Sequence, residues 1–265
     1  MSTVSNDGVS LYYHRESGGE DEGEPVVFVP EAGLGGWSWG WQHAALTGPY
    51  ETVVWDLRGT GRSDAPPGPY SMETLVADLE TVLAAVDARN AHLVGAGLGG
   101  AVALAAARES TRVATLSVLG TAARRAAFDL EPLLADPDDR AALRKSLETG
   151  LSADFRTNQP DIVDGIVDWR ADGDATREGW TAQLAALEGF DADDWLVEVT
   201  QPTRVFHGTA DELVPAEAGR DLAAGLPRGE FVPLPRAGHL VGIERSRAIN
   251  DRLLGFLESR ADDEG

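Results

Sequence analysis

Short apolar runs bounded by turn-forming residues recur along the 265-residue chain, a pattern typical of buried strands. Helix-length segments lie between several of these runs, for example Met72 to Ala88 and Gly100 to Arg108. Strands that alternate with helices predict an α/β fold, with a mainly parallel central sheet flanked by helices. The runs are VSLYYH (9–14), PVVFVP (25–30), ETVVWD (51–56), AHLVGA (91–96), VATLSVLG (113–120), TRVFHG (203–208) and EFVPLP (230–235).

The stretch from 121 to 199 differs, because it has helical periodicity and no strand-like run. Asp136 and Pro137 resemble an N-cap and a first helical position, and Gly150 would close that helix. We therefore predict a small helical cap at 121–199, inserted between core segments 1–120 and 200–265. Two apolar stripes are spaced for helices: Ile162, Ile166 and Trp169, then Trp180, Leu184 and Leu187.

The aromatic residues of this insertion suggest the kind of molecule that the protein handles. Trp169, Trp180 and Phe190 are predicted to line a pocket under the cap. Such side chains favour an apolar or aromatic small molecule as substrate or ligand.

Charge and composition narrow the range of partners. The formal charge of −22 argues against binding to nucleic acid or to an anionic membrane. Lys145 is the single lysine among 22 basic residues, and with the acidic excess this resembles the composition of proteins from halophilic organisms. The absence of cysteine excludes disulfides, a thiolate nucleophile and cysteine-ligated metals. With neither a signal-peptide pattern nor a long apolar span, a cytoplasmic protein is expected.

The glycine-rich turn HLVGAGLGG (92–100) contains G-x-G-x-x-G, formed by Gly95, Gly97 and Gly100. A dinucleotide site would place this motif in the first βαβ unit and a carboxylate about 20 residues later. Here the motif comes late, and the next predicted strand ends in Gly120 and Thr121 without an acid. No nucleotide or other cofactor is therefore expected.

Four blocks in the observed order resemble those of the α/β-hydrolase superfamily, over essentially the whole chain. VFVPEAGLGGWSW (27–39) resembles the oxyanion-hole strand and loop, and VVWDLRGTGRSDAP (53–66) resembles the D-x-R-G-x-G-x-S segment. LVGAGLGG (93–100) stands at the place of the nucleophile elbow. HGTADELVP (207–215) and RAGHLVGIE (236–244) resemble the loops that carry the catalytic acid and histidine.

The resemblance implies that Asp211 and His239 form a catalytic pair. The chemistry agrees, because a histidine oriented by a carboxylate is an effective base near neutral pH. Both residues follow predicted strands, so they could meet at one edge of the sheet. The other histidines, His14, His43, His92 and His207, are expected to be structural, and Arg58 is expected to brace a turn.

Two positions depart from the family pattern. The elbow G-x-S-x-G is here Gly95-Ala96-Gly97-Leu98-Gly99, so Gly97 replaces the serine nucleophile. The sequence GWSWG does match G-x-S-x-G, but it lacks the strand–turn–helix context, so its Ser38 is not expected to be the nucleophile. Glu31 replaces part of the usual His-Gly dipeptide, which leaves the backbone N–H groups of Ala32 and Leu98 as oxyanion donors.

Three functions remain open from the sequence. In the first, His239 and Asp211 perform general-base chemistry without a covalent intermediate, with Glu31 as a second acid or base. In the second, the chain is a non-catalytic pseudo-hydrolase that binds a small molecule. In the third, it is an ordinary ester or amide hydrolase with an unrecognised nucleophile. A metal held by Glu31, Asp211 and His239 lacks a recognisable ligand spacing, so no metal is expected, and the oligomeric state stays open.

Overall fold

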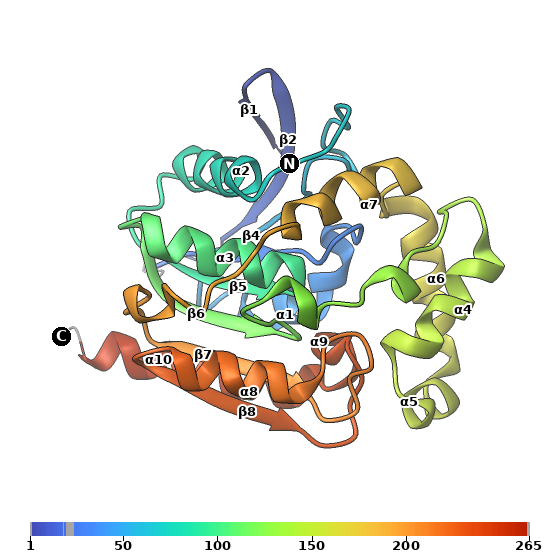
Figure 1. Ribbon diagram of the computed structural model, residues 1–265. Helices are drawn as coiled ribbons and strands as arrows, with labels where there is room; N and C mark the ends of the chain where they lie inside the picture. The colour runs from blue at the N-terminus through green and yellow to red at the C-terminus, as the bar shows by residue number, and fades with distance from the viewer. Residues whose placement is uncertain (1, 18, 20–23, 264–265) are drawn as a thin grey trace.

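An eight-stranded sheet forms the centre of the computed structural model, which describes residues 2–17, 19 and 24–263 (Figure 1). The strand order is β1-β2-β4-β3-β5-β6-β7-β8; β1 and β2 are antiparallel to their neighbours, and the remaining pairs are parallel. The strands are β1 (Ser2–Asn6), β2 (Val9–Glu16), β3 (Val26–Val29), β4 (Thr52–Trp55), β5 (Ala91–Ala96), β6 (Val113–Leu119), β7 (Thr203–Gly208) and β8 (Gly229–Leu234).

Helices cover both faces of this sheet. The α-helices are α1 (Gly40–Leu46), α2 (Met72–Ala85), α3 (Leu98–Glu109), α4 (Arg140–Gly150), α5 (Ala153–Asn158), α6 (Pro160–Gly173), α7 (Arg177–Leu184), α8 (Ala216–Gly225), α9 (Val241–Glu244) and α10 (Ser246–Asp263). Short 3₁₀ helices lie at Gly36–Trp39, Arg125–Ala127, Glu131–Leu133, Ala185–Leu187 and Leu196–Glu198. Among the described residues, no helix is both long and apolar enough to cross a membrane.

The central strands bury side chains on both faces, which explains their continuous apolar runs. In β3, Val27 and Val29 point into the core under α2, α3 and α8. Val26 and Phe28 point the opposite way, into a second core under α1 and α10. This alternation follows from the two-residue period of a strand, so β3 contributes to both cores at once.

Helices α4 to α7 lie together at one end of the sheet, in the segment that joins β6 to β7 (Figure 1). We refer to residues 121–199 as the cap segment. Gln183 of α7 ties it to the core: its side-chain amide donates to the carbonyl oxygen of Arg58 at 2.7 Å and accepts from the backbone N–H of Gly33 at 2.6 Å. The cap segment is thereby held against the loop that follows β3.

The D-x-R-G-x-G-x-S segment builds a turn. Asp56 accepts hydrogen bonds from the backbone N–H groups of Gly36 and Arg62, at 2.7 and 3.0 Å. The Arg58 guanidinium makes two 2.6 Å hydrogen bonds to Asp78 of α2. These contacts agree with the architectural role expected for Arg58.

The structure differs from the sequence expectations at three boundaries. The N-terminal strand β1 was not predicted, because its sequence STVSN is polar, yet it pairs with β2 at the sheet edge. The prediction that Asp136 caps the first cap helix is wrong: α4 begins at Arg140, and Asp139 is the N-cap. The tail ESRADDEG (258–265), which the sequence predicts to be frayed and solvated, belongs to α10 as far as Asp263, while residues 264–265 lie outside the described residues.

Asp139→Ala is expected to lower the free energy of unfolding by about 1 kcal/mol, the usual contribution of an N-cap. The Asp139 carboxylate accepts hydrogen bonds from the N–H groups of Ala141 and Ala142, at 3.1 and 3.0 Å. Urea denaturation of this variant beside Asp136→Ala measures the effect. An Asp136→Ala variant that lost more stability would restore Asp136 as the dominant cap.

Candidate active site

Gly97 lies at the sharp turn between β5 and α3, where a nucleophile elbow places its catalytic side chain. Its backbone has φ 47° and ψ −111°, a conformation that is strained for any residue with a side chain. A Cβ atom built on Gly97 would overlap the carboxylate of Glu31. The space that a serine side chain would need is therefore filled by a side chain from another loop.

The Glu31 carboxylate sits where both the nucleophile and the oxyanion are expected. Its Oε1 accepts hydrogen bonds from the backbone N–H groups of Ala32, at 2.6 Å, and Leu98, at 3.0 Å. These are the two donors that the sequence assigned to the oxyanion hole. Its Oε2 lies 2.9 Å from Nε2 of His239, and Glu31 is only 2% exposed.

His239 bridges two carboxylates. Its Nδ1 lies 2.9 Å from Oδ2 of Asp211, opposite the contact between Nε2 and Glu31. The other oxygen of Asp211, Oδ1, accepts from the backbone N–H groups of Leu213 and Val214, both at 2.9 Å. The sequence prediction that His239 and Asp211 meet is confirmed by this geometry, with Glu31 as an additional partner.

The electrostatics favour a charged imidazolium. Burial disfavours the charge on His239, but Asp211 and Glu31 outweigh it and raise the pKa of His239 to about 10. Burial also disfavours the Asp211 carboxylate, yet His239 and His207 hold the pKa of Asp211 well below its usual range. At neutral pH, His239 therefore carries a proton on both ring nitrogens and donates one hydrogen bond to each carboxylate.

Little free volume adjoins this centre. The cavity next to Glu31 and His239 measures about 30 Å³, well below the roughly 300–1,000 Å³ of small-molecule sites. Trp180 of α7 packs on the loop that follows Glu31, since a Cβ on Gly33 would overlap its indole ring. The three charged groups are enclosed by protein in this conformation.

The three cap aromatics predicted to share a pocket do not lie together. Trp180 is 2% exposed and packs on the loop after β3, whereas Trp169 is 44% exposed and lines a separate cavity. Phe190 lines a third hollow, with Trp195. The prediction of one aromatic cap pocket is wrong, because α6 and α7 direct their stripes to different surfaces.

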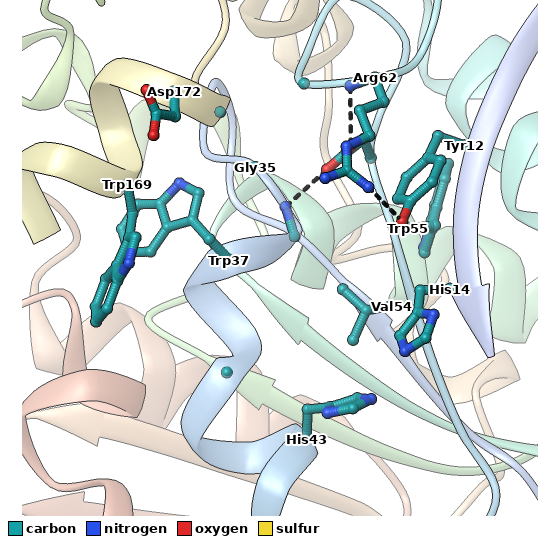
Figure 2. Close-up of a pocket in the computed structure, with 15 residues that line it drawn as sticks. Tyr12, His14, Gly35, Trp37, His43, Val54, Trp55, Arg62, Trp169 and Asp172 are labelled. Carbon is teal, nitrogen blue, oxygen red and sulfur yellow. Dashed lines mark hydrogen bonds between the residues drawn. The ribbon is translucent and has the colours of Figure 1, made fainter. Parts of the chain in front are cut away.

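A larger cavity, of about 590 Å³, lies on the outer side of the β3–α1 loop (Figure 2). Trp37 and Trp169 form one wall, with ring centroids 6.1 Å apart. Arg62 forms another: its guanidinium donates to the Tyr12 hydroxyl at 2.7 Å and lies over the Tyr12 ring. We call this the outer cavity; its lining does not include Glu31, Asp211 or His239.

Two further residues support the centre: His207, which was expected to be structural, and Glu244, which the sequence did not single out. His207 places Nε2 3.3 Å from Oδ2 of Asp211 and 2.8 Å from the carbonyl oxygen of Val214. Glu244 accepts from the backbone N–H of Gly238 at 3.1 Å and from the Ser152 hydroxyl at 2.6 Å, which fixes the His239 loop to the cap segment. The only sequence signal for either was its position inside a family block.

Solved structures of similar fold include hydrolases. The enol-lactonase of Burkholderia xenovorans LB400 aligns with a TM-score of 0.85 and 26% identity, over 97% of this chain and 100% of that one. An esterase of Thermogutta terrifontis aligns with a TM-score of 0.82 and 25% identity, over 98% of each chain.

Sequence comparison gives the same grouping. A protein of Caulobacter segnis named "Putative carbamate hydrolase RutD" is 32% identical, over 97% of this chain and 99% of its own length. The model of the alpha/beta hydrolase family matches residues 26–252. The chain therefore belongs to the alpha/beta hydrolase family.

Proposed function

We propose that this chain is a pseudo-hydrolase, in which Glu31, His239 and Asp211 form a structural ion network, and that its activity is the binding of a small molecule. The observation that carries the proposal is the position of Glu31. One carboxylate fills the space of the missing serine side chain and also occupies both donors of the oxyanion hole.

Each group that a hydrolase offers to its substrate already has an internal partner. The N–H groups of Ala32 and Leu98 bind Oε1 of Glu31, and Nε2 of His239 binds Oε2. A buried polar network in which every member is satisfied is rigid and specific. Such a centre supports the fold, and displacing Glu31 would leave buried donors unpaired.

The catalytic alternatives from the sequence receive less support. Ordinary ester hydrolysis needs a serine and a free oxyanion hole, and losing the serine of a triad costs about 10⁶ in turnover. General-base catalysis by His239 alone needs a neutral imidazole, whereas the pKa of His239 is raised to about 10 by its two carboxylates against the effect of burial.

The outer cavity supports the binding part of the proposal. At about 590 Å³ it falls in the size range of small-molecule sites. Trp37 and Trp169 offer an aromatic wall, while Arg62 and Asp172 supply charged groups at its edge (Figure 2). An aromatic or apolar molecule with a polar substituent fits this lining.

One observation favours a second candidate, a hydrolase with a carboxylate nucleophile. Glu31 holds Oε1 in the oxyanion hole and presents Oε2 beside His239. Because the hole is already filled, the electrophile would be a saturated carbon, such as that of an alkyl halide or epoxide. Oε2 would form a C–O bond as the leaving group departs with the electron pair of the broken bond and, where it is an alkoxide, takes the proton of His239.

Hydrolysis of that ester would complete the reaction. Alkylation removes the negative charge of Glu31, which lowers the pKa of His239. Where the leaving group is a halide, the imidazolium then releases one proton to solvent, and where it is an alkoxide that proton has already been transferred. The neutral imidazole can take a proton from water. The hydroxide would add to Cδ of Glu31, with the oxyanion on Oε1 stabilised by Ala32 and Leu98. Release of the alcohol, which receives the proton from His239, would leave one water-derived oxygen in Glu31.

Oxygen labelling separates the two candidates. The protein is incubated in H₂¹⁸O with panels of p-nitrophenyl esters, alkyl halides and epoxides, and the peptide that contains Glu31 is then weighed by mass spectrometry. The pseudo-hydrolase proposal expects neither product nor label. A mass gain of about 2 Da at Glu31, with product formation, would establish the carboxylate nucleophile instead.

Glu31→Gln is the matched control, because it keeps the shape of the side chain and removes its nucleophilic oxygen. Product formed at equal rates by the wild-type protein and this variant, with no label in either, would overturn both candidates. Product lost in His239→Gln but not in Glu31→Gln would restore general-base catalysis by His239.

A further inference from the structure

His14, Glu16 and His43 gather at one edge of the sheet, outside the centre described above. His14 and Glu16 are two residues apart on β2, so their side chains emerge on the same face of the strand. His43 lies on α1, which packs against β4 next to β2. One ligand atom from each residue lies within 4.8 Å of the other two.

The distances suit a metal better than direct hydrogen bonding. Nε2 of His14 is 3.5 Å, and Nε2 of His43 is 3.4 Å, from the same oxygen, Oε2 of Glu16. Charge-assisted hydrogen bonds to a carboxylate are shorter, about 2.7–2.9 Å. Ligands that bind Zn²⁺ at about 2.0–2.2 Å in a tetrahedron stand about 3.3–3.6 Å apart, which is the separation of each histidine from Glu16.

Two ring nitrogens of this cluster lack hydrogen-bond partners in the described part of the chain. Nε2 of His43 and Nδ1 of His14 are buried and have no hydrogen-bond partner among the described residues. A buried polar atom without a partner costs about 1–3 kcal/mol. A cation between the three side chains would give Nε2 of His43 the partner that it lacks.

We propose that His14, Glu16 and His43 form a binding site for a divalent transition metal, with Zn²⁺ as the reference ion. Two imidazoles and one carboxylate form a recurrent ligand set of zinc sites that leave the fourth position open. Imidazole nitrogens favour such ions over Ca²⁺ and Mg²⁺, which prefer oxygen ligands. The site departs from the sequence expectations, which made both histidines structural and included no metal.

The proposed metal site lies beside the outer cavity, so the fourth coordination position of the metal could bind a ligand there. His14 and His43 line the outer cavity, at the end away from Trp37 and Trp169 (Figure 2). A metal there would present its fourth position to the cavity, so a small molecule with an oxygen or nitrogen donor could bind the metal while its body contacts the two indoles. Metal binding itself does not depend on the state of Glu31 or His239, whose centre is separate.

Titration of the tag-free protein with Zn²⁺ and with Co²⁺ tests the proposal. The net charge of −22 attracts any divalent cation, so the titrations are run in high salt with excess Mg²⁺. We expect one equivalent of Zn²⁺ by calorimetry and the visible absorption of Co²⁺ in a low-symmetry nitrogen and oxygen environment. His14→Gln, Glu16→Gln and His43→Gln should each weaken Zn²⁺ binding by at least about 100-fold.

Glu217→Gln is the charge-matched control, since Glu217 is exposed on α8, at the opposite edge of the sheet. It should bind Zn²⁺ like the wild-type protein, and so should Glu31→Gln. Circular dichroism checks that the three ligand variants remain folded, as expected for partly exposed side chains. Equal Zn²⁺ affinity in the wild-type protein and all three ligand variants would overturn the site, as would no Co²⁺ absorption.

Discussion

Gly97→Ser, the substitution that restores the residue typical of a nucleophile elbow, is expected to destabilise this protein by at least about 3 kcal/mol. The new Cβ would overlap the Glu31 carboxylate and force it out of its buried position. That movement leaves the N–H groups of Ala32 and Leu98 unpaired and takes one carboxylate from His239. Strain at φ 47° adds about 1–3 kcal/mol.

Removing the carboxylate at the same time should relieve the overlap. We expect Glu31→Ala/Gly97→Ser to be more stable than Gly97→Ser alone, so that the two substitutions are strongly non-additive. Denaturant unfolding of the wild-type protein, both single variants and the double variant gives the coupling energy. A Gly97→Ser protein as stable as the wild type would show that Glu31 does not occupy the elbow.

The double variant should also gain esterase activity. Its serine would lie where Oε2 of Glu31 stood, beside His239, and the N–H groups of Ala32 and Leu98 would be free for an oxyanion. We expect labelling by a fluorophosphonate probe and hydrolysis of p-nitrophenyl acetate at least about 10² faster than in Glu31→Ala, the matched control without the hydroxyl. No labelling of the folded double variant would mean that the enclosed site excludes even small acyl groups.

The sequence predicted the parallel sheet well because buried strands carry a strong local signal. Each of the seven apolar runs forms a strand, and the helices at 72–88 and 100–108 appear with boundaries shifted by a few residues. The polar strand β1 lacked this signal, since it is held by backbone pairing with β2 at an exposed edge. Edge strands of this kind depend on a partner that local sequence does not reveal.

The catalytic-type pair was predictable, whereas the place of Glu31 was not. Asp211 and His239 follow β7 and β8, and parallel strands bring such loops to one edge. In the sequence, the missing serine and Glu31 are two departures from the family pattern. In the structure the two departures are linked, because the Glu31 carboxylate fills the volume that a side chain on Gly97 would need. This contact joins two loops that are far apart in the sequence, so no local pattern predicts it.

For the cap aromatics, the sequence predicted the helices but not the surfaces on which they pack. Helical spacing placed Trp169 and Trp180 on apolar stripes, and both lie on helices. The angle between α6 and α7 decides which surface each stripe meets, and no local pattern encodes that angle. Trp180 therefore packs on Gly33 in the loop after β3, while Trp169 reaches the outer cavity.

Glu31→Gln is expected to change the pH dependence of stability, because Glu31 is one of the two carboxylates that raise the pKa of His239. Burial disfavours charge on His239, but Asp211 and Glu31 together raise its pKa to about 10, from 6.5 for the free side chain. A pKa raised by folding stabilises the protein fully below pH 6.5, and this stabilisation is lost as the pH rises through 10. The free energy of unfolding should therefore fall across this window, by at most about 1.4 kcal/mol per pH unit for one proton.

In Glu31→Gln the amide oxygen can keep the hydrogen bonds from Ala32 and Leu98, and the amide nitrogen can donate to Nε2 of a neutral His239. The variant should be less stable than the wild type at pH 7, by about 1–3 kcal/mol, and the difference should shrink toward pH 10 as the wild-type imidazolium loses its proton. The other titratable groups are common to both proteins and cancel in the difference. Urea denaturation at a series of pH values, with ¹⁵N shifts of His239 to report its protonation, measures both effects; a stability difference that stays constant from pH 6 to pH 10 would show that Glu31 does not hold the proton on His239.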